Sequence, residues 1–377
     1  MSASGSVATS DVAADSRFMR LALWLGRRGL GRTWPNPAVG AVIVRDAEIV
    51  GRGWTQPGGR PHAEIEALQR AREMARGATL YVTLEPCSHH GKSPPCADAV
   101  IASGIARVVS AMEDPNPEVA GRGHVRLRGA GIVVDVGIEA AAARRDHAGH
   151  IRRMRDGRPH VMLKLAISAD GKAAGAGRKR VPITGNAVRD RVHQMRACSD
   201  AIMIGIGTAL ADDPVLTCRL PGMAKMSPTR VVLDAGLRLP MQSRLLATAG
   251  ETPLWIITGK HAPATSEIAV RQRGAEVARV AEKEGRLDLR EVLNFLAERG
   301  ITRLMVEGGP TVASALIEAD LVDEAIFFHS PIVIGEDGLP ALEPRAAKLA
   351  KKQLDQVSSQ PVGPDRQETC ERESDHV

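Results

Sequence analysis

The chain has 377 residues, which suits two domains of ordinary size, and its 44% hydrophobic and 25% charged residues exclude an intrinsically disordered chain. No apolar run reaches the roughly 18 to 20 residues that a membrane-spanning helix needs, so we expect no membrane partner. The formal net charge of +6 would allow nucleic-acid binding, but one Tyr, four Phe and four Trp are few for base stacking. The positive surplus fits a small anionic substrate at least as well, and we expect no nucleic-acid partner.

The N-terminal stretch, residues 1–16, is small and polar. It contains no basic segment followed by an apolar one, as a secretory signal would. We interpret it as a flexible lead into a helix that starts near Arg17. We therefore expect a cytoplasmic protein whose five cysteines are reduced, where closely spaced cysteines more often mean metal binding or catalysis than a structural disulfide.

Residues 17–148 are expected to form a first domain. Its expected elements are a hairpin between 37 and 54, a helix over 62–75, a strand over 78–87, a helix that begins at Cys96, and strands at 106–113 and 131–137. Two prolines precede Cys96, a placement typical of a helix start. The order β-β-α-β-α-β-α-β indicates a layered α/β domain.

Residues 149–158 lie in an arginine-rich stretch that ends in Gly and Pro, and we interpret them as the linker between domains. A solvated basic helix is the alternative. Residues 159–377 repeat the alternation of strand and helix patterns, which predicts a second α/β domain with a largely parallel sheet. The strand candidates are 160–171, 200–207, 229–236, 253–259 and 301–309. The polar stretch from 346 onward is expected to hold one final strand before a loose tail.

His62, Cys87 and Cys96 form the first candidate site. A catalytic zinc takes three thiolate or imidazole ligands and leaves its fourth position to water. Two of these residues are expected to open helices, whose positive N-terminal ends favour thiolate over thiol. Glu64 lies in the same first turn as His62, so its carboxylate could reach the water on the metal, which a purely structural zinc site would not need.

Alternatives exist for each part of this site. The triplet His-Ala-Glu can arise by chance on a surface helix, and Cys87 and Cys96 could form a disulfide. His89 and His90 could be other ligands or substrate contacts, although loop histidines are more often solvated. The His-x-Glu element followed by Pro-Cys and a second Cys is, however, the pattern of zinc-dependent nucleobase deaminases. The usual Cys-x-x-Cys is widened here to eight intervening residues.

Four segments carry a more specific resemblance: "WPNPAVGAVIV", "PHAEIEAL", "YVTLEPCSHHGKSPPC" and "DPNPEVAGRG". They resemble the deaminase half of the bifunctional riboflavin-biosynthesis deaminase/reductase family, RibD or RibG, in which the wide cysteine spacing is part of the pattern. The resemblance implies a cytidine-deaminase-like three-layer domain. It also implies zinc on the three ligands, Glu64 as proton carrier and Asn36 near the pyrimidine. Lys92, from its place in the loop, is our candidate for the substrate phosphate, with an exposed loop lysine as the alternative.

In the second domain the residues alone indicate little about nucleotide binding. The glycine turn at 308–309 follows a predicted strand and leads into a helix, where backbone N–H groups can bind an anion. It is not the dinucleotide-binding pattern Gly-x-Gly-x-x-Gly. The segment Gly205–Leu210 has the first two glycines of that pattern and lacks the third.

The segments "KLAISADGK", "ITGNAVRDRVHQMRACSDAIMIGIGTALADDPVLTCR" and "VEGGPTVASALIEADLVDE" resemble the reductase half of the same family. The resemblance implies a dihydrofolate-reductase-like α/β fold that uses NADPH. The implied cofactor contacts are Ile167, Pro182, Thr208, Asp212, Gly309, Pro310, Thr311, Val312, Ala313, Ser314 and Ala315. The implied substrate contacts are Arg180, Arg196, Leu216, Arg219 and Glu307. Lys164, Asp212 and Glu307 could polarise or protonate the sugar carbonyl, and Arg196 and Arg219 could clamp a phosphate.

The segment "KRVPIT" departs from this pattern. Pro182 stands where the family usually has an aromatic residue that is expected to touch the cofactor. Arg180 stands where the family usually has a small polar residue. The contacts of this segment in this chain are therefore expected to differ from those of the family.

The resemblance covers about residues 17 to 345 and predicts a bifunctional enzyme. Zinc-dependent deamination of 2,5-diamino-6-(5-phosphoribosylamino)pyrimidin-4-one would be followed by NADPH-dependent reduction of the ribosyl group to ribityl. We further expect a homo-oligomer. The alternative is a nucleoside or tRNA deaminase with a non-catalytic C-terminal binding or oligomerisation domain, against which the low aromatic content and the wide cysteine spacing both speak.

Overall fold

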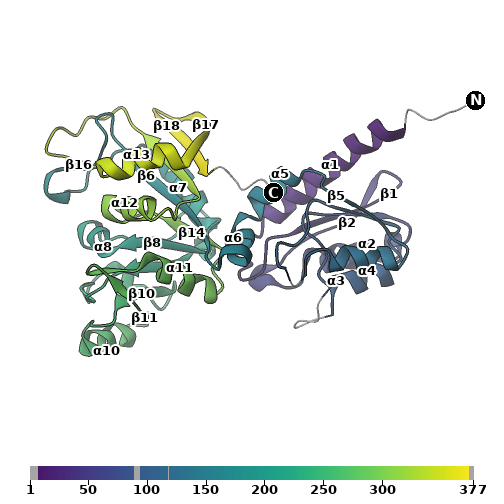
Figure 1. The fold of residues 1–377 in the computed structure, drawn as a ribbon, viewed down its shortest axis with the longest axis horizontal. Coiled ribbons are helices and arrows are strands. Elements are labelled where there is room, and N and C mark those ends of the chain that lie inside the picture. The colour runs from purple at the N-terminus through teal and green to yellow at the C-terminus, as the bar shows by residue number, and fades with distance from the viewer. Residues whose placement is uncertain (1–6, 89–93, 118, 373–377) are drawn as a thin grey trace, which may run out of the picture. The chain divides into compact units, whose positions relative to one another are not determined.

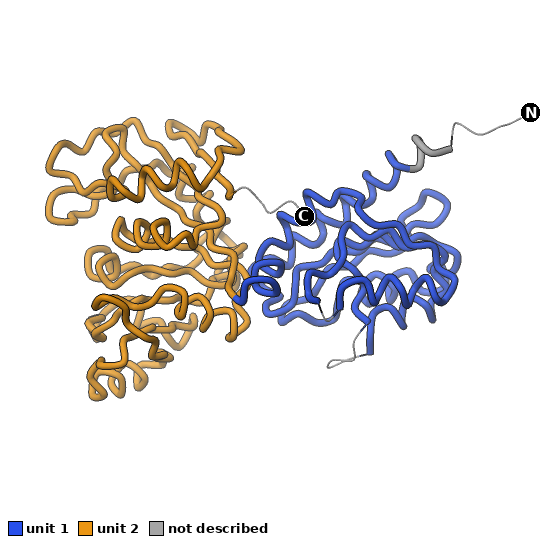
Figure 2. The backbone as a smooth tube through the Cα atoms, viewed as in Figure 1, with its two compact units in different colours: residues 1–157 blue, residues 158–377 orange. Residues whose placement is uncertain are grey.

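The computed structural model describes residues 7–88, 94–117 and 119–372. The chain divides into two compact units, Met1–Gly157 and Arg158–Val377 (Figure 2). Each unit has a main sheet of its own. Among the described residues, no helix has the length and apolar character needed to cross a membrane.

The elements of the first unit follow the predicted order (Figure 1). They are α1 (Val7–Arg27), β1 (Gly40–Arg45), β2 (Glu48–Trp54), α2 (Ala63–Ala71), β3 (Thr79–Val82), α3 (Cys96–Ala102), β4 (Arg107–Ser110), α4 (Arg122–Gly129), β5 (Val133–Val136), α5 (Ala140–Asp146) and α6 (Ala148–Asp156). The sheet has the strand order β2-β1-β3-β4-β5. The pairs β1–β2 and β1–β3 are antiparallel, whereas β3–β4 and β4–β5 are parallel.

The first unit has three layers because successive side chains of a strand point to opposite faces of the sheet. In β1, Ala41 and Ile43 join the apolar cluster formed with α2, α3 and α4. Val42 and Val44 join a second cluster, formed with α1 and α5. The sheet is therefore buried on both faces, as its continuous apolar runs predict.

The helix α1 begins at Val7, so the prediction of a flexible lead over residues 1–16 is wrong for residues 7–16. A tertiary contact explains the difference. The carboxylate of Asp15 is buried and accepts hydrogen bonds from the Tyr81 hydroxyl, at 2.7 Å, and from both terminal nitrogens of Arg107, at 2.9 and 2.7 Å. These partners lie on strands more than sixty residues away, so local composition could not reveal the contact.

The predicted linker, 149–158, also needs correction, because most of it forms α6. The alternative of a basic helix is closer to the structure. Arg152 and Asp156 form an ion pair one turn apart at 2.8 Å. His147, the residue before α6, and His150 within it are both buried, so the helix packs into the first unit instead of crossing open solvent.

The second unit contains a larger α/β arrangement. Its elements are β6 (His160–Ile167), β7 (Lys172–Ala174), α7 (Asn186–Ala197), β8 (Ala201–Gly205), α8 (Ile206–Asp212), β9 (Thr229–Leu233), α9 (Arg244–Ala247), β10 (Leu254–Gly259), α10 (Ala264–Gln272), β11 (Glu276–Val280), β12 (Glu282–Lys283), β13 (Arg286–Leu287), α11 (Leu289–Glu298), β14 (Arg303–Val306), α12 (Pro310–Glu318), β15 (Glu324–His329), β16 (Leu339–Pro340), α13 (Pro344–Gln353), β17 (Leu354–Val362) and β18 (Asp365–Arg372). All five strand candidates correspond to strands, and β11 and β15 are additional ones.

The main sheet of the second unit has the order β11-β10-β9-β8-β14-β6-β15-β18-β17. Every neighbouring pair from β11 to β15 is parallel. The central strands β8, β14 and β6 therefore end at the same edge. In open α/β sheets this carboxyl edge is where ligands bind, which directs attention to the residues that follow these three strands.

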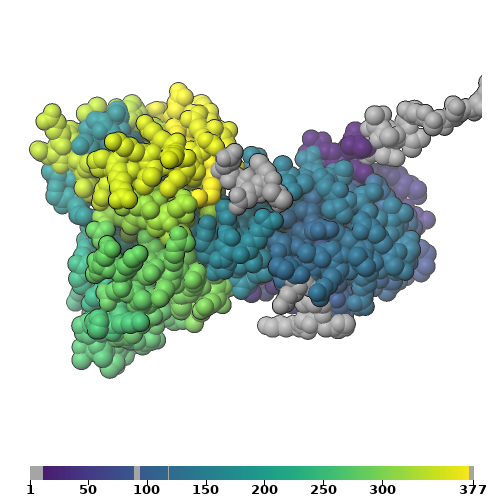
Figure 3. Space-filling model, viewed as in Figure 1, coloured from purple at the N-terminus to yellow at the C-terminus, as the bar shows by residue number. Residues whose placement is uncertain are grey.

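The C-terminal region differs from the prediction of one strand and a loose tail. It forms α13 and then two antiparallel strands, β17 and β18, which extend the main sheet through β15 (yellow in Figures 1 and 3). The strand β17 is exposed along nearly its whole length. The polar composition of β17 predicts a tail, because a strand that is exposed on both faces has no apolar pattern that would indicate a strand.

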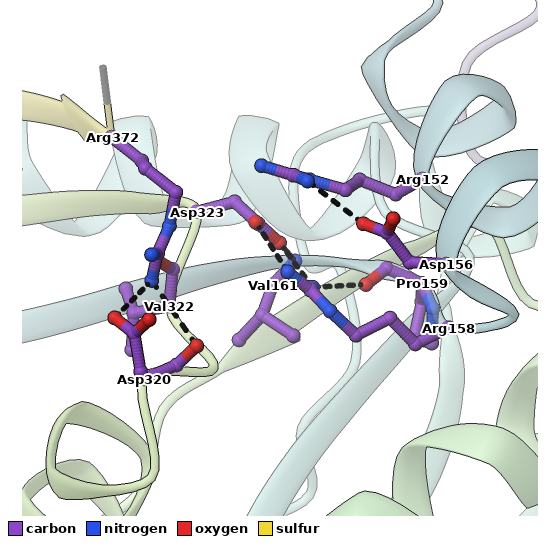
Figure 4. A network of polar contacts seen from close by, with 9 residues as sticks. All are labelled: Arg152, Asp156, Arg158, Pro159, Val161, Asp320, Val322, Asp323 and Arg372. Carbon is purple, nitrogen blue, oxygen red and sulfur yellow. Dashed lines mark hydrogen bonds and ion pairs between the residues drawn. The ribbon is translucent and has the colours of Figure 1, made fainter. Parts of the chain in front are cut away.

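A buried carboxylate anchors the start of β6 (Figure 4). Asp323 accepts hydrogen bonds from Arg158 at 2.6 and 2.7 Å and from the backbone N–H of Val161 at 2.8 Å. Nearby in the same unit, Arg372 pairs with Asp320 at 2.8 Å. These contacts join the first and last strands of the second unit to the turn before β15.

Replacing Asp323 with Ala should destabilise the second unit by about 3 kcal/mol, because the Arg158 guanidinium and a buried backbone N–H would lose their acceptor. Chemical denaturation followed by fluorescence would measure the loss. Glu276→Ala is the matched control. Glu276 forms an exposed ion pair with Arg299, and surface pairs contribute only about 0 to 1 kcal/mol. Equal effects of the two substitutions would contradict the anchoring role.

Candidate active sites

Three residues from different elements converge in the first unit. His62 immediately precedes α2, Cys96 is the first residue of α3, and Cys87 lies in the loop after β3. The Nδ1 atom of His62 lies 3.3 Å from the Cys96 Sγ and 3.7 Å from the Cys87 Sγ. The three ligand atoms all lie within 4.8 Å of one another.

This donor set fits a zinc ion. Tetrahedral bonds of about 2.3 Å to sulfur and about 2.0 to 2.1 Å to nitrogen place ligand atoms about 3.5 to 3.8 Å apart, close to the distances between His62 and the two cysteines. The backbone also orients Cys87. Its Sγ accepts a hydrogen bond from the Cys96 N–H at 3.3 Å, and its carbonyl accepts one from the Ala97 N–H at 3.2 Å. Neither cysteine is in a disulfide, and three ligands leave one coordination position open.

The two cysteines differ in protonation. The hydrogen bond with Cys96 and the neighbouring His62 lower the pKa of the Cys87 thiol to about 4. The same hydrogen bond, together with burial and the nearby Glu64, raises the pKa of Cys96. Without metal, the pair therefore holds one thiolate and one thiol at neutral pH.

Glu64 lies in the first turn of α2, with its side chain buried. Burial, and next the negative charge of Cys87, raise the pKa of Glu64 to about 7. A carboxyl group with this pKa can both accept and donate a proton near neutral pH. The structure thus places a group suited to proton transfer beside the candidate zinc ligands.

The other residues expected near the pyrimidine are less constrained. Asn36 is half-buried, and its side-chain amide donates to the Gly59 carbonyl at 2.7 Å. Lys92, His89 and His90 lie outside the described residues.

Glu85 is a residue of this site that the sequence analysis missed. Its buried carboxylate accepts hydrogen bonds from the backbone N–H groups of Asp114 at 3.1 Å, Gly121 at 2.9 Å, Gly123 at 2.6 Å and His124 at 3.3 Å. A Cβ at Gly123 would lie 2.1 Å from the Pro86 carbonyl oxygen, so only glycine fits there. The position of Glu85, two residues before Cys87, is the sequence feature that could have indicated a role near the zinc ligands.

A cavity of about 330 Å³ lies in the second unit at the carboxyl ends of β8, β14 and β6. It brings together many of the residues singled out from the sequence. Those that line it are Lys164, Arg180, Pro182, Arg196, Thr208, Asp212, Arg219, Glu307, Gly309 and Pro310. The hydroxyl of Thr208 accepts a hydrogen bond from the Gly309 N–H at 3.0 Å, which ties α8 to the start of α12.

Other expected contacts do not line this cavity. They are Ile167, Leu216, Thr311, Val312, Ala313, Ser314 and Ala315. Leu216 is buried in the core, and Ser314 accepts a hydrogen bond from the Glu343 N–H at 2.9 Å. The helical turn therefore presents its first residues to the cavity and its later ones to neighbouring helices.

Arg178, Arg189 and His193 line the cavity and were missed. A helical signal existed for two of them, because residues 189, 193 and 196 recur at the spacing of one face of α7.

An ion pair between Arg196 and Glu307 lines this cavity. Arg196 donates to the two carboxylate oxygens of Glu307 at 2.6 and 2.9 Å and to the Thr217 carbonyl at 3.0 Å. Burial opposes ionisation of Glu307, but Arg196 and then Lys164 outweigh it and lower its pKa. Burial also lowers the pKa of Lys164, which Glu307 partly offsets. Burial raises the pKa of Asp212, against the positive charge of Arg180.

Comparison with known proteins identifies both units. Residues 159–367 match the RibD C-terminal domain, and residues 12–112 match the cytidine and deoxycytidylate deaminase zinc-binding region. The riboflavin biosynthesis protein RibD of Escherichia coli is 44% identical over 345 residues, which cover 87% of this chain and 92% of that protein. Its counterpart in Bacillus amyloliquefaciens is 43% identical over 325 residues, 86% of each chain. The chain belongs to the RibD family.

Solved structures agree with this assignment. Acinetobacter baumannii RibD, form 2, matches with a TM-score of 0.85 at 34% identity, covering 96% of this chain and 99% of that one. A diaminohydroxyphosphoribosylaminopyrimidine deaminase/5-amino-6-(5-phosphoribosylamino)uracil reductase from Thermotoga maritima matches with a TM-score of 0.83 at 33% identity and the same coverage. The predicted fold, a cytidine-deaminase-like domain followed by a dihydrofolate-reductase-like one, is confirmed.

As a RibD protein, the chain is a bifunctional enzyme of riboflavin biosynthesis, with a zinc-dependent deaminase in its first unit and an NADPH-dependent reductase in its second. The alternative of a nucleoside or tRNA deaminase is not favoured. The match to the RibD C-terminal domain covers most of the second unit, so that unit is not a mere binding module.

Loading the metal-free protein with zinc should release about one proton or more per site at pH 7, because zinc takes both cysteines as thiolates and Cys96 starts as a thiol. The apparent affinity for zinc should consequently weaken as the pH falls. Calorimetric titrations in two buffers of different ionisation enthalpy would reveal the release. A binding enthalpy independent of the buffer would contradict this arrangement of protons.

Proposed function

We propose that the first unit deaminates 2,5-diamino-6-(5-phosphoribosylamino)pyrimidin-4-one and that the second unit then reduces the ribosyl group of the product to ribityl. The observation that carries the first half is the convergence of His62, Cys87 and Cys96 beside the buried Glu64. The second half is supported by the cavity of the second unit. Lys164 and Glu307, which is held by Arg196, line it together with residues of α8 and α12.

In the deaminase site, His62, Cys87 and Cys96 hold the metal. Zinc bound there supplies activation of water as a nucleophile. Glu64 takes a proton from the attacking water and delivers it to the departing amino group, so that ammonia leaves. A pKa of Glu64 near 7 suits both steps. Asn36 orients the pyrimidine, and Lys92 is our candidate for the substrate phosphate.

Glu64→Gln should keep one zinc per chain but lower the rate of ammonia release by about 10²- to 10⁴-fold, the range typical of a lost acid–base group. The amide keeps the shape of the carboxylate and cannot carry protons. Metal analysis and an ammonia assay would measure the two properties, with reduction by the second unit as the control for folding. Retained deamination would remove Glu64 from the mechanism.

In the reductase site, NADPH supplies hydride. Lys164 is the group that polarises or protonates the sugar carbonyl, since its lowered pKa makes it a better proton donor than an exposed lysine. Glu307, held by Arg196, keeps its negative charge next to Lys164 and orients the ammonium group. Asp212 is a second candidate proton donor. Thr208 and the first residues of α12 contact the cofactor, while Arg196 and Arg219 contact the substrate.

Lys164→Met should lower the turnover of the reductase by about 10²- to 10⁴-fold while the deaminase keeps its rate. The substitution keeps most of the side-chain volume and removes the ammonium group. The assay is oxidation of NADPH at saturating substrate, with ammonia release by the same sample as its control. An unchanged turnover would exclude Lys164 as the proton donor.

We also propose that the protein is a homo-oligomer of the cytoplasm, as the family resemblance suggests. Analytical ultracentrifugation across a range of protein concentrations tests the first part, and fluorescent tagging in cells tests the second.

A further inference from the structure

The cavity of the second unit is strongly cationic. Its lining includes six basic side chains, Lys164, Arg178, Arg180, Arg189, Arg196 and Arg219, against two acidic ones, Asp212 and Glu307. So many like charges in one cavity repel one another unless an anion binds between them. The arrangement therefore favours anionic ligands.

The basic side chains are not equivalent. Arg196 is occupied by Glu307 and a backbone carbonyl. The guanidinium groups of Arg178 and Arg180, by contrast, make no hydrogen bond and no ion pair within contact distance with the part of the chain that the structure describes. Both arginines are exposed and lie on the segment that joins β7 to α7. They are available to a ligand.

Arg178 lies against α8. A Cβ added at Gly207 would come within 3.2 Å of its Nη1 atom, so the guanidinium lies over the first turn of that helix. Arg180 lies close enough to Asp212, at the other end of α8, for its charge to act on that carboxyl. Thr208 lies between Gly207 and Asp212 on α8, and its hydroxyl accepts a hydrogen bond from the backbone N–H of Gly309 at the start of α12.

Arg189 and Arg219 line a different wall of the cavity. Arg189 and His193 project from α7, and the backbone N–H of Arg219 donates to the His193 Nδ1 at 3.3 Å. That wall adjoins Arg196, which we assign to the substrate together with Arg219. The wall of Arg178 and Arg180 is the one that carries Thr208, to which we assign the cofactor.

We propose that Arg178 and Arg180 bind phosphate groups of the nicotinamide cofactor and determine how strongly the reductase prefers NADPH. The inference rests on the proposed reductase function, and it moves Arg180 from the substrate to the cofactor. Guanidinium groups bind phosphate through paired hydrogen bonds. These contacts would add phosphate binding in the segment where Pro182 replaces the aromatic residue of the family.

The test compares three single substitutions in the full-length, zinc-loaded protein: Arg178→Gln, Arg180→Gln and Lys179→Gln. Lys179 is the matched control, because it is exposed, carries the same charge and lies between the two arginines without lining the cavity. The KM for NADPH and for NADH is measured for each at saturating substrate. Thermal unfolding followed by fluorescence checks in every sample that the second unit is folded.

Loss of a charged hydrogen bond to phosphate should raise the KM for NADPH by about tenfold to a hundredfold in Arg178→Gln and Arg180→Gln, and leave it unchanged in Lys179→Gln. If the KM for NADH stays constant, the arginines bind the 2′-phosphate, which NADH lacks. If both values rise equally, they bind the pyrophosphate.

Unchanged KM values in both arginine variants, or an equal rise in Lys179→Gln, would overturn the inference. A wild-type protein that does not oxidise NADPH in the presence of substrate would instead refute the proposed reductase function. The two failures are therefore distinguishable.

Discussion

Both sites depend on parallel strands that end at a common edge of a sheet. In the first unit, Cys87 follows β3, and the two helices that begin nearby contribute Cys96 and the residue before α2. In the second unit, β8, β14 and β6 are neighbours in the sheet although β14 comes about a hundred residues after β8 in the sequence. This geometry gathers chemically useful side chains from distant segments without any local motif that joins them.

The two glutamates at these sites end with opposite pKa shifts, although burial raises the pKa of both. Glu64 is buried beside a sulfur that carries negative charge, so its pKa rises and it can exchange protons. Glu307 lines a cavity and is less completely buried, and the arginine that holds both of its oxygens outweighs the effect of burial and lowers its pKa. The partners of each carboxylate, more than its burial, decide whether it carries protons or a fixed charge.

Backbone N–H groups help to position the loop between β3 and α3, which contains Cys87. The carboxylate of Glu85 accepts hydrogen bonds from four backbone N–H groups, 29 to 39 residues further along the chain. It thereby fixes the chain immediately before Cys87. These hydrogen bonds tie the loop after β3 to the start of α4.

Motifs in the sequence predicted the zinc ligands, Glu64 and the two-domain fold, because thiolate and imidazole chemistry demands particular residues and because buried strands read as apolar runs. The polar hairpin of β17 and β18 lacked that signal and was missed. The start of α1 was missed as well, because Asp15 on this helix is held by hydrogen bonds from Arg107 on β4, which is distant in the sequence.

The sequence by itself determined the chemistry that is possible here: which residues can bind zinc, carry a proton or attract phosphate. Only the tertiary structure decided which of them meet. It turned Leu216 and Ser314 toward neighbouring elements and away from the cavity, and it committed Arg196 to Glu307. It also placed Arg178 and Arg180 at the cavity. The physical reason is that residue type sets what a side chain can do, whereas strand order and helix register set its neighbours.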